Sequence, residues 1–462
     1  MLLWQVAGGW RYALAVPTLW LAGGAALGVV ILEQVIPATP SPRPSLPDHH
    51  TPGTSPWLAR LILPALLGLA LGIRLVWLAA PDPVGDLELA ARRMGFLYRH
   101  GLAGAYLYEG DYLPVRLYLL SGLSHLAAHF GGNFHEPLSP VTLVCIKLPG
   151  LLADLTTAVV IFSWSRQWQP VRRAAAIAAL YTLAPPVWMN VAWWGQVDAL
   201  LMLPLMGVVL LLDRAGGRWS WLCWTLALLI KPQALILSPL LLVATLRLHG
   251  VRGFAQGAAL SVALFAAACT PLVLAHQGPG LAQAYLGSVG RFPKLTIGAY
   301  NLWYLVTGGA SGDDGSLVLG PLTSRALGLL LVGGMVGLVV LALLRRSDHL
   351  ARTQGAAVLA LSFFLLPTQI HERYLFLTLA FLSLCIATDR RMVGPYLVLV
   401  CAATLNILGT LSGFMPIATP FIASSPLPFL CAVGNMAVLA YLVGSLWFRP
   451  GPAPGRIAPN LV

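Results

Sequence analysis

Apolar runs of about 17–25 residues recur along nearly the whole chain, and each is long enough to cross a hydrocarbon layer as an α-helix. This recurrence limits the possible folds more than any other feature. The spanning strands of a membrane β-barrel alternate in polarity and are only about 10 residues long, so the runs do not fit that architecture. The sequence therefore predicts an all-α, polytopic integral membrane protein.

Composition agrees with this class. Of the 462 residues, 58% are hydrophobic and 10% are charged, whereas soluble domains are typically about 25% charged. The net charge of +12 does not indicate nucleic-acid binding, because the arginines lie in short clusters between apolar runs, as the positive-inside rule predicts for cytoplasmic loops. The clusters are Arg166/Arg172/Arg173, Arg214/Arg218, Arg247/Arg252, Arg345/Arg346/Arg352 and Arg390/Arg391.

The chain divides into three parts. Residues 1–56 hold an apolar segment, about 11–32, and a linker rich in Pro and Ser, which we interpret as a retained helix followed by an extended stretch. A signal peptide is the alternative for the first segment, but the run is longer than a typical apolar core. Residues 57–390 form the predicted membrane module, and 391–462 add C-terminal helices and a short basic tail. We expect about 11–13 transmembrane helices, some short or broken.

Two long hydrophilic connections, 81–112 and 276–300, are expected to face away from the cytoplasm, because the other loops carry most of the arginines. This assignment conflicts with counting both 113–130 and 139–163 as full spans. That count would put the basic loop 166–173 on the same side as the first connection. Two alternatives stay open: one of the two segments is re-entrant or interfacial, or the charge rule is broken locally.

Several ionisable residues lie within apolar runs, where each costs about 2.5–3.5 kcal/mol and so needs a partner or a function. Lys147 and Asp154 are seven residues apart and share one helix face, so either they compensate each other or they pair with a neighbouring helix. His125 and His129 also share a face. No acid accompanies them in a metalloprotease pattern, so we expect an interfacial pair rather than a metal site. The six cysteines are scattered without metal-type spacing.

Lys231 lies between two short apolar runs, 219–230 and 233–246, and precedes a proline that removes a backbone donor. Broken helices are tolerated at membrane depth only beside protein or a wet cavity, so we expect two half-helices meeting at a site. Lys231 either holds an anion there or snorkels to the interface. Asp198 ends the stretch WWGQVD and is either a polar helix start beside an aromatic belt or part of the same site.

Seven stretches, taken in order, together resemble the GT-C membrane glycosyltransferases. The closest resemblance is to the bacterial proteins related to the GPI-anchor mannosyltransferases. It covers residues 84–376 and not the two ends of the chain. The stretches are VGDLELA (84–90), EGDYLPVRLYLL (109–120), KLPGLLADL (147–155), WWGQVDALLMLP (193–204), LIKPQALILSPL (229–240), AYNLWYL (299–305) and LPTQIHERYLF (366–376).

The resemblance implies an enzyme that moves a hexose, mannose foremost, from a polyprenyl-phosphate carrier to a hydroxyl of a lipid, glycan or protein acceptor. The reaction would take place on the outer side of a bacterial cytoplasmic (inner) membrane. Asp86, on the first long external loop, would be the general base. Glu88 makes an Asp-x-Glu variant of the family's Asp-x-Asp-like motif. Because this third position departs from the pattern, a divalent cation (Mg²⁺ or Mn²⁺) at the motif stays open and no metal ligand is assigned.

The departing phosphate needs cations and hydrogen-bond donors. We assign donor and phosphate binding to Lys231, Gln233, His371, Arg373 and Arg291, and expect a supporting role for Asp111, Tyr112, Gln196, Asp198, Asn301 and Glu372. A wet hinge between helices is the alternative for the HERY stretch, with Arg373 snorkelling to lipid headgroups. The site interpretation requires Arg373 to face the cavity that Asp86 overlooks.

Two other functions compete with transfer. A transporter or lipid-carrier flippase of envelope glycan biogenesis would also use intramembrane charges and broken helices, but no inverted repeat is visible. A non-catalytic scaffold would leave the ordered motifs unexplained. The chain has no Gly-x-Ser-x-Gly motif, no Walker A loop and no dinucleotide fingerprint, which argues against an ATP-driven pump core.

Overall fold

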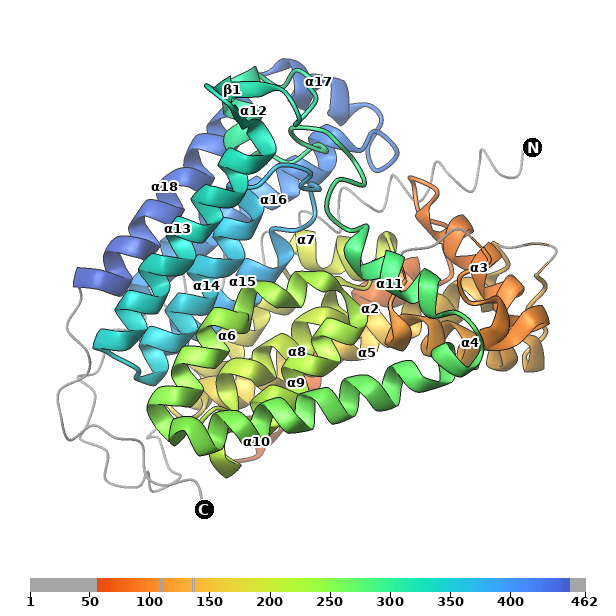
Figure 1. Ribbon diagram of the computed structural model, residues 1–462, viewed down its shortest axis with the longest axis horizontal. Helices are drawn as coiled ribbons and strands as arrows, with labels where there is room; N and C mark the ends of the chain where they lie inside the picture. The colour runs from red at the N-terminus through yellow and green to blue at the C-terminus, as the bar shows by residue number, and fades with distance from the viewer. Residues whose placement is uncertain (1–55, 109–111, 135, 137, 449–462) are drawn as a thin grey trace.

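The computed structural model describes residues 56–448 except 109–111, 135 and 137 (Figure 1). In this part the chain is helical almost throughout, with one short two-stranded ribbon, so the all-α prediction is confirmed. By length and composition, six helices could cross a membrane, and a bent pair, Val171–Thr182 with Pro185–Trp193, would make a seventh. The membrane character is thus supported, while the larger helix count stays a prediction. The apolar segment 11–32 lies outside the described residues.

The first half of the described chain runs from α2 to α8. A π-helical turn, η2, interrupts it just before the polar stretch that ends in Asp198. The elements are α2 (Pro56–Leu78), α3 (Asp86–His100), η1 (Gly101–Gly104), α4 (Pro114–His129), α5 (Pro140–Ser165), α6 (Val171–Thr182), α7 (Pro185–Trp188), η2 (Met189–Trp193) and α8 (Asp198–Leu210).

The second half contains the long helices seen in green to blue in Figure 1. The elements are η3 (Ala215–Gly217), α9 (Arg218–Ile230), η4 (Pro232–Leu237), α10 (Ser238–Leu274), α11 (Gly278–Leu286), α12 (Leu302–Thr307), β1 (Leu317–Leu319), β2 (Leu322–Thr323), α13 (Ser324–Arg345), α14 (His349–Leu365), α15 (Phe376–Thr388), η5 (Arg390–Met392), α16 (Val393–Thr410), α17 (Ala418–Ser424) and α18 (Leu427–Phe448).

The helix break predicted at Lys231 is present. Helix α9 ends at Ile230, Lys231 has an extended backbone (φ −152°, ψ 144°), and Pro232 starts the 3₁₀ turn η4. The proline explains the break, because it lacks a backbone donor and disfavours helical geometry in the preceding residue. Helix α10 has a second break at Gly250, whose φ of 63° and ψ of −168° are non-helical. Residues 238–249 and 251–274 are therefore two helical pieces.

The arginine clusters gather at one end of the helix bundle. Arg352, in the first turn of α14, binds Asp213, which follows α8. Its Nη1 and Nη2 lie 3.0 and 2.7 Å from the carboxylate oxygens. The Arg247 guanidinium donates to the carbonyl of Leu343, and the Gln169 amide donates to the carbonyl of Ala387. Five basic loops thus share one side, the distribution that the positive-inside rule describes.

This arrangement bears on the topological conflict around α4. Lys147, in the first third of α5, bonds to the carbonyl of Ala80 near Asp86, whereas the end of α5 leads to Gln169 at the arginine-rich end. Helix α4 has 16 residues and is not among the six long apolar helices. Only α5 therefore runs between the Asp86 connection and the basic loop 166–173, which fits the first of the two alternatives.

Helices α14 and α15 form the centre of the bundle. Every residue from Phe376 to Ala387 in α15 is buried, as are nearly all of those in α14. Burial on all sides requires apolar residues around the whole helix, and both sequences have them. The HERY stretch connects these two helices, so the surrounding protein, rather than an outer edge of the bundle, holds it.

Candidate functional site

Asp86 is the first residue of α3, and its backbone is fixed by another acid. Asp82 accepts hydrogen bonds from the backbone N–H groups of Asp86 and Leu87 at 2.8 and 3.0 Å, so it acts as a side-chain cap for the helix start. Burial raises the pKa of Asp82, although these two backbone donors oppose the shift. Gly85 precedes the helix with φ 88°, a left-handed conformation that glycine adopts without strain.

The Asp86 carboxylate is held by two neutral donors. Trp194 Nε1 and Gln196 Nε2 donate to the same oxygen, Oδ2, at 2.9 and 2.7 Å. Asp86 is exposed, and no hydrogen bond to its second oxygen, Oδ1, is formed by the described residues. The carboxylate is therefore oriented through one oxygen and open at the other.

Gly195, between these two donors, has to be a glycine. Its φ is 77°, and a Cβ there would lie 2.7 Å from Leu87 Cδ2 and 3.1 Å from Lys147 Cε. The polar stretch can approach α3 closely only because this atom is absent. Gln196 was a predicted site residue. Trp194 was not, since tryptophans beside a membrane helix are ordinarily interfacial.

Asp198 is the centre of a buried ionic cluster. Its Oδ1 lies 2.5 Å from Lys231 Nζ, and its Oδ2 lies 3.0 Å from Asn190 Nδ2 and 3.9 Å from Arg373 Nε. The aspartate side chain is 4% exposed, and those of Lys231 and Arg373 are 13% and 15% exposed. Residues from three distant stretches thus meet, and Asp198 is both the first residue of α8 and a member of the cluster.

Arg373 joins this cluster to Asp86. Its guanidinium carbon lies 4.9 Å from the centroid of the Trp194 ring, the same indole that donates to Asp86, and its Nη1 lies 3.2 Å from Glu372 Oε1. A cation over an indole face is favourable, more so where water is excluded. Arg373 therefore lies against the indole that donates to Asp86, with 15% of its side chain exposed, and the site interpretation of HERY stays a prediction.

His371 and Gln233 line the edge of the cluster. The His371 backbone bridges to Ile297 and Gly298, and its Nδ1 lies 3.8 Å from Glu372 Oε2. Gln233 follows the break after Lys231, whose Nζ lies 5.7 Å from the Tyr374 ring centroid. The two predicted phosphate-binding stretches, KPQ and HERY, are therefore neighbours in space.

Glu88 does not join Asp86. It pairs with Arg92 one helical turn later at 2.6 Å, and the two side chains are 44% and 55% exposed. Residues two apart on a helix point to nearly opposite faces, which explains the separation. Among the described residues no group of three His, Cys, Asp or Glu side chains could hold a metal ion. Asp86 and Glu88 thus have separate partners in the described residues, and metal binding at the motif stays open.

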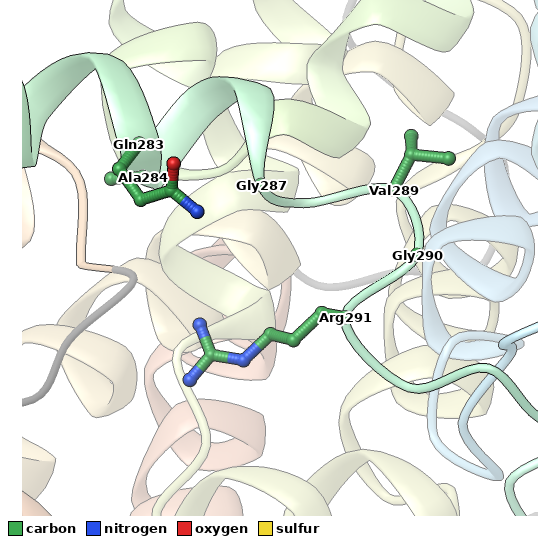
Figure 2. A pocket seen from close by; sticks show the side chains of 6 residues that line it. All are labelled: Gln283, Ala284, Gly287, Val289, Gly290 and Arg291. Carbon is green, nitrogen blue, oxygen red and sulfur yellow. The ribbon is translucent and has the colours of Figure 1, made fainter.

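Arg291 lies on the loop after α11 and lines a separate pocket. The pocket has a volume of about 350 Å³ and is lined by Gln283, Ala284, Gly287, Val289, Gly290 and Arg291. In Figure 2 the Gln283 amide and the Arg291 guanidinium point into the space between the helix and the loop that follows it. The backbone N–H of Gly290 donates to Gln369 Oε1 at 2.9 Å, which joins this loop to the segment just before His371.

The remaining supporting residues have structural contacts. Asn301 Oδ1 accepts the backbone N–H groups of Trp303 and Tyr304, both at 3.1 Å, and so caps α12. The Tyr112 ring lies between two guanidinium groups, with Arg93 and Arg116 at 3.6 and 3.3 Å from its centroid. Asp111 lies outside the described residues.

One structurally important acid was not predicted. Asp314 accepts hydrogen bonds from Arg325, Thr368 and Gln369 at 2.6–3.0 Å, and its side chain is fully buried. Desolvation alone would raise its pKa, but the bonds from Arg325, Gln369 and Thr368 outweigh it, so the pKa of Asp314 is lowered. This carboxylate fastens an outer loop to the segment that leads into HERY.

The two predicted charges of α5 have separate partners. Asp154 pairs with Arg74 of α2 at 2.6 Å, and both side chains are completely buried, so the pairing with a neighbouring helix holds for Asp154. Lys147 donates to backbone carbonyls instead. The mutual compensation between Lys147 and Asp154 was therefore wrong. Of the two histidines, His125 packs on the Tyr98 ring and His129 on Phe130.

Comparison with known proteins adds no assignment. No protein-family model matches the chain, and no curated protein matches it. A function has to be inferred from the residues and their geometry.

Proposed function

We propose that this protein is a membrane glycosyltransferase of the GT-C type. It takes a hexose, most simply mannose, from a polyprenyl-phosphate donor and transfers it to an acceptor hydroxyl, with Asp86 as general base. The observation that carries the proposal is the pairing of an open carboxylate oxygen on Asp86 with a buried cation cluster one indole away. A base and an anion-binding group on one side of the bundle are what transfer from a lipid phosphate requires.

The residues divide the chemistry between them. Asp86 Oδ1 accepts the proton of the acceptor hydroxyl, while Trp194 and Gln196 hold the carboxylate through Oδ2. The acceptor oxygen bonds to the anomeric carbon as the bond from that carbon to the phosphate oxygen breaks, and the electron pair leaves with the lipid phosphate. General-base assistance contributes typically about 10²–10⁴-fold. One direct displacement inverts the anomeric configuration.

Lys231 and Arg373 stabilise the departing phosphate. Both cations pair with the same carboxylate, that of Asp198, and Arg373 also pairs with Glu372. Charge-assisted hydrogen bonds from lysine and arginine to phosphate are roughly twice as strong as neutral ones. His371 and Gln233, at the edge of the cluster, are further donors for the same group. Arg291, on the neighbouring loop, contacts the donor or the acceptor as either enters.

The bilayer is the other partner in this proposal. The arginine-rich end of the bundle faces the cytoplasm, as the positive-inside rule requires, so Asp86 faces outward across a bacterial inner membrane. The six long helices, the bent pair of α6 with α7 and η2, and the shorter helices α8, α9, α14 and α15 would supply 11 crossings, the lower end of the proposed 11–13. Because Asp86 and Glu88 diverge, no step is assigned to a metal ion.

The test is a transfer assay with purified protein in proteoliposomes. A panel of polyprenyl-phosphate hexoses with radiolabelled sugars is offered together with membrane extracts that contain candidate acceptors. The proposal expects labelled product to appear with at least one donor and the polyprenyl phosphate to be released in equal amount. Movement of the intact donor across the bilayer without release of its sugar would instead identify a transporter or flippase.

A further inference from the structure

Lys147 connects two chain segments that both lead to Asp86. Its Nζ donates to the carbonyl oxygens of Trp77 and Ala80 at 2.9 and 2.7 Å, and to those of Ala192 and Trp193 at 2.7 and 3.3 Å. The side chain is buried, at 1% exposure. An ammonium group has three donors, so the longest of the four contacts shares a proton with another.

One segment leads to the backbone of Asp86 and the other leads to the donors of its carboxylate. After Trp77 and Ala80 the chain reaches Asp82, the cap of α3, and then Asp86 itself. After Ala192 and Trp193 it reaches Trp194 and Gln196, the two donors to Asp86 Oδ2. One ammonium group therefore fixes the main chain that carries the base and the main chain that carries its donors.

The junction is also tightly packed. Trp77 and Trp193 stack with their centroids 4.2 Å apart, and Gly195 approaches both Leu87 and Lys147 too closely to accept a Cβ without movement. Four carbonyls turned toward one buried point repel one another unless a cation lies between them. Their convergence therefore depends on the ammonium group.

We propose that Lys147 is a positioning residue for Asp86. It holds the carboxylate at the distance from Trp194 and Gln196 at which Oδ2 is bonded and Oδ1 is presented to the acceptor. The effect on the reaction rests on the proposed glycosyl transfer, whereas the effect on the Asp86 carboxylate does not. One buried ammonium group thus contacts two backbone segments at once.

The experiment compares Lys147→Met with Arg352→Met. Arg352 is 2% exposed and lies at the arginine-rich end, so this control also removes a buried cation and lowers stability without touching the Asp86 region. The first readout is carbodiimide-driven amidation of Asp86 as a function of pH, followed by peptide mass spectrometry. We expect Lys147→Met to change the Asp86 labelling rate at least threefold, while Arg352→Met leaves it at the wild-type value.

The second readout is the transfer assay. For Lys147→Met we expect kcat to fall about 10-fold or more with the donor KM nearly unchanged, because Asp86 is misplaced while Lys231 and Arg373 remain. Gly195→Ala keeps the ammonium group but displaces the same junction, so it should also lower kcat with the donor KM nearly unchanged. This variant replaces Lys147→Met if Lys147→Met does not fold. Wild-type Asp86 labelling in both variants overturns the inference. If no variant and no wild-type protein transfers sugar, the proposed function fails while the labelling still decides the role of Lys147.

Discussion

The two ends of the helix bundle carry the same kinds of charged side chain in different arrangements. At the arginine-rich end, Asp213 receives two hydrogen bonds from one guanidinium, that of Arg352, and Arg346 binds the nearby Asp348 at 2.9 Å. The Arg352–Asp213 pair joins α14 to the turn that follows α8, whereas Arg346 and Asp348 pair within one loop. Geometrically matched pairs of this kind serve chiefly to fix one helix against another.

At the other end the pairing is unequal. Asp198 is shared between Lys231 and Arg373, with the second cation at 3.9 Å. Among the described residues, the side chains that donate to the Asp86 carboxylate are the neutral ones of Trp194 and Gln196. Two cations that share one carboxylate can also bind an added anion. A carboxylate that is hydrogen-bonded through one oxygen can still accept a proton on the other. In our proposal, buried charges hold the helices together at one end of the bundle and take part in the reaction at the other.

The largest effect is expected from removing the shared carboxylate. Asp198→Asn leaves Lys231 and Arg373 buried beside each other without their common anion, which costs about 3–5 kcal/mol of unfolding free energy. The same change at the other end, Asp348→Asn, should cost only about 1 kcal/mol, because Asp348 and its partner Arg346 lie in one loop and are 27% and 17% exposed to water. Thermal unfolding in detergent measures both, and equal losses would erase the contrast between the two ends.

A smaller effect is expected from each donor to Asp86. Gln196→Leu and Trp194→Phe each remove one hydrogen bond to Oδ2, worth about 0.5–1.5 kcal/mol, so the transfer rate should fall up to about 10-fold. Trp164→Phe is the matched control, since its indole N–H bonds the Leu384 carbonyl at the arginine-rich end. An equal loss of rate in the control would show that the effect is not specific to Asp86.

A pH-dependent effect is expected at Asp314. Because its pKa is lowered in the folded protein, its ion pair contributes stability above the ordinary aspartate pKa of about 4 and loses it as pH falls below that value. Hydrogen exchange of residues 312–325, corrected for intrinsic rates, should therefore be faster at pH 3 than at pH 6. Asp314→Asn should exchange fast at both pH values. If the wild type stays equally protected at pH 3, the ion pair does not hold this loop.

The smallest effect is expected at Glu88. Its pair with Arg92 is exposed on the helix surface, so Glu88→Gln should change the free energy of unfolding by less than about 0.5 kcal/mol and leave transfer near the wild-type rate. Glu136→Gln, at another exposed acid of the same region, is the comparison. A large loss of transfer in Glu88→Gln alone would restore a chemical role to the Asp-x-Glu pair.

The sequence predicted those features that depend on local pattern. The break after Ile230 follows from a proline after a lysine within an apolar run, and the all-α class follows from run length. Lys231, Asp198 and Arg373 were selected because each is a charge where charge is costly, and the structure brings these three together.

What the sequence could not predict is partner choice across the fold. Nothing near Asp154 indicates that its partner is Arg74, 80 residues earlier, rather than Lys147 on its own helix. Trp194 was not predicted, because tryptophans beside an apolar run usually mark a membrane interface and the sequence does not indicate what the indole N–H will bond to. Asp314 lies in a loop without periodicity, so only its contacts disclose its role.

The most direct test of the central claim is the transfer rate of Asp86→Asn in proteoliposomes, with Glu136→Gln measured alongside. Asparagine keeps the size of the side chain but cannot accept the hydroxyl proton, so the rate should fall about 10²–10⁴-fold. The control should retain the wild-type rate, and both variants should unfold near the wild-type temperature. Normal transfer by folded Asp86→Asn would contradict the account, because the reaction would then proceed without this base.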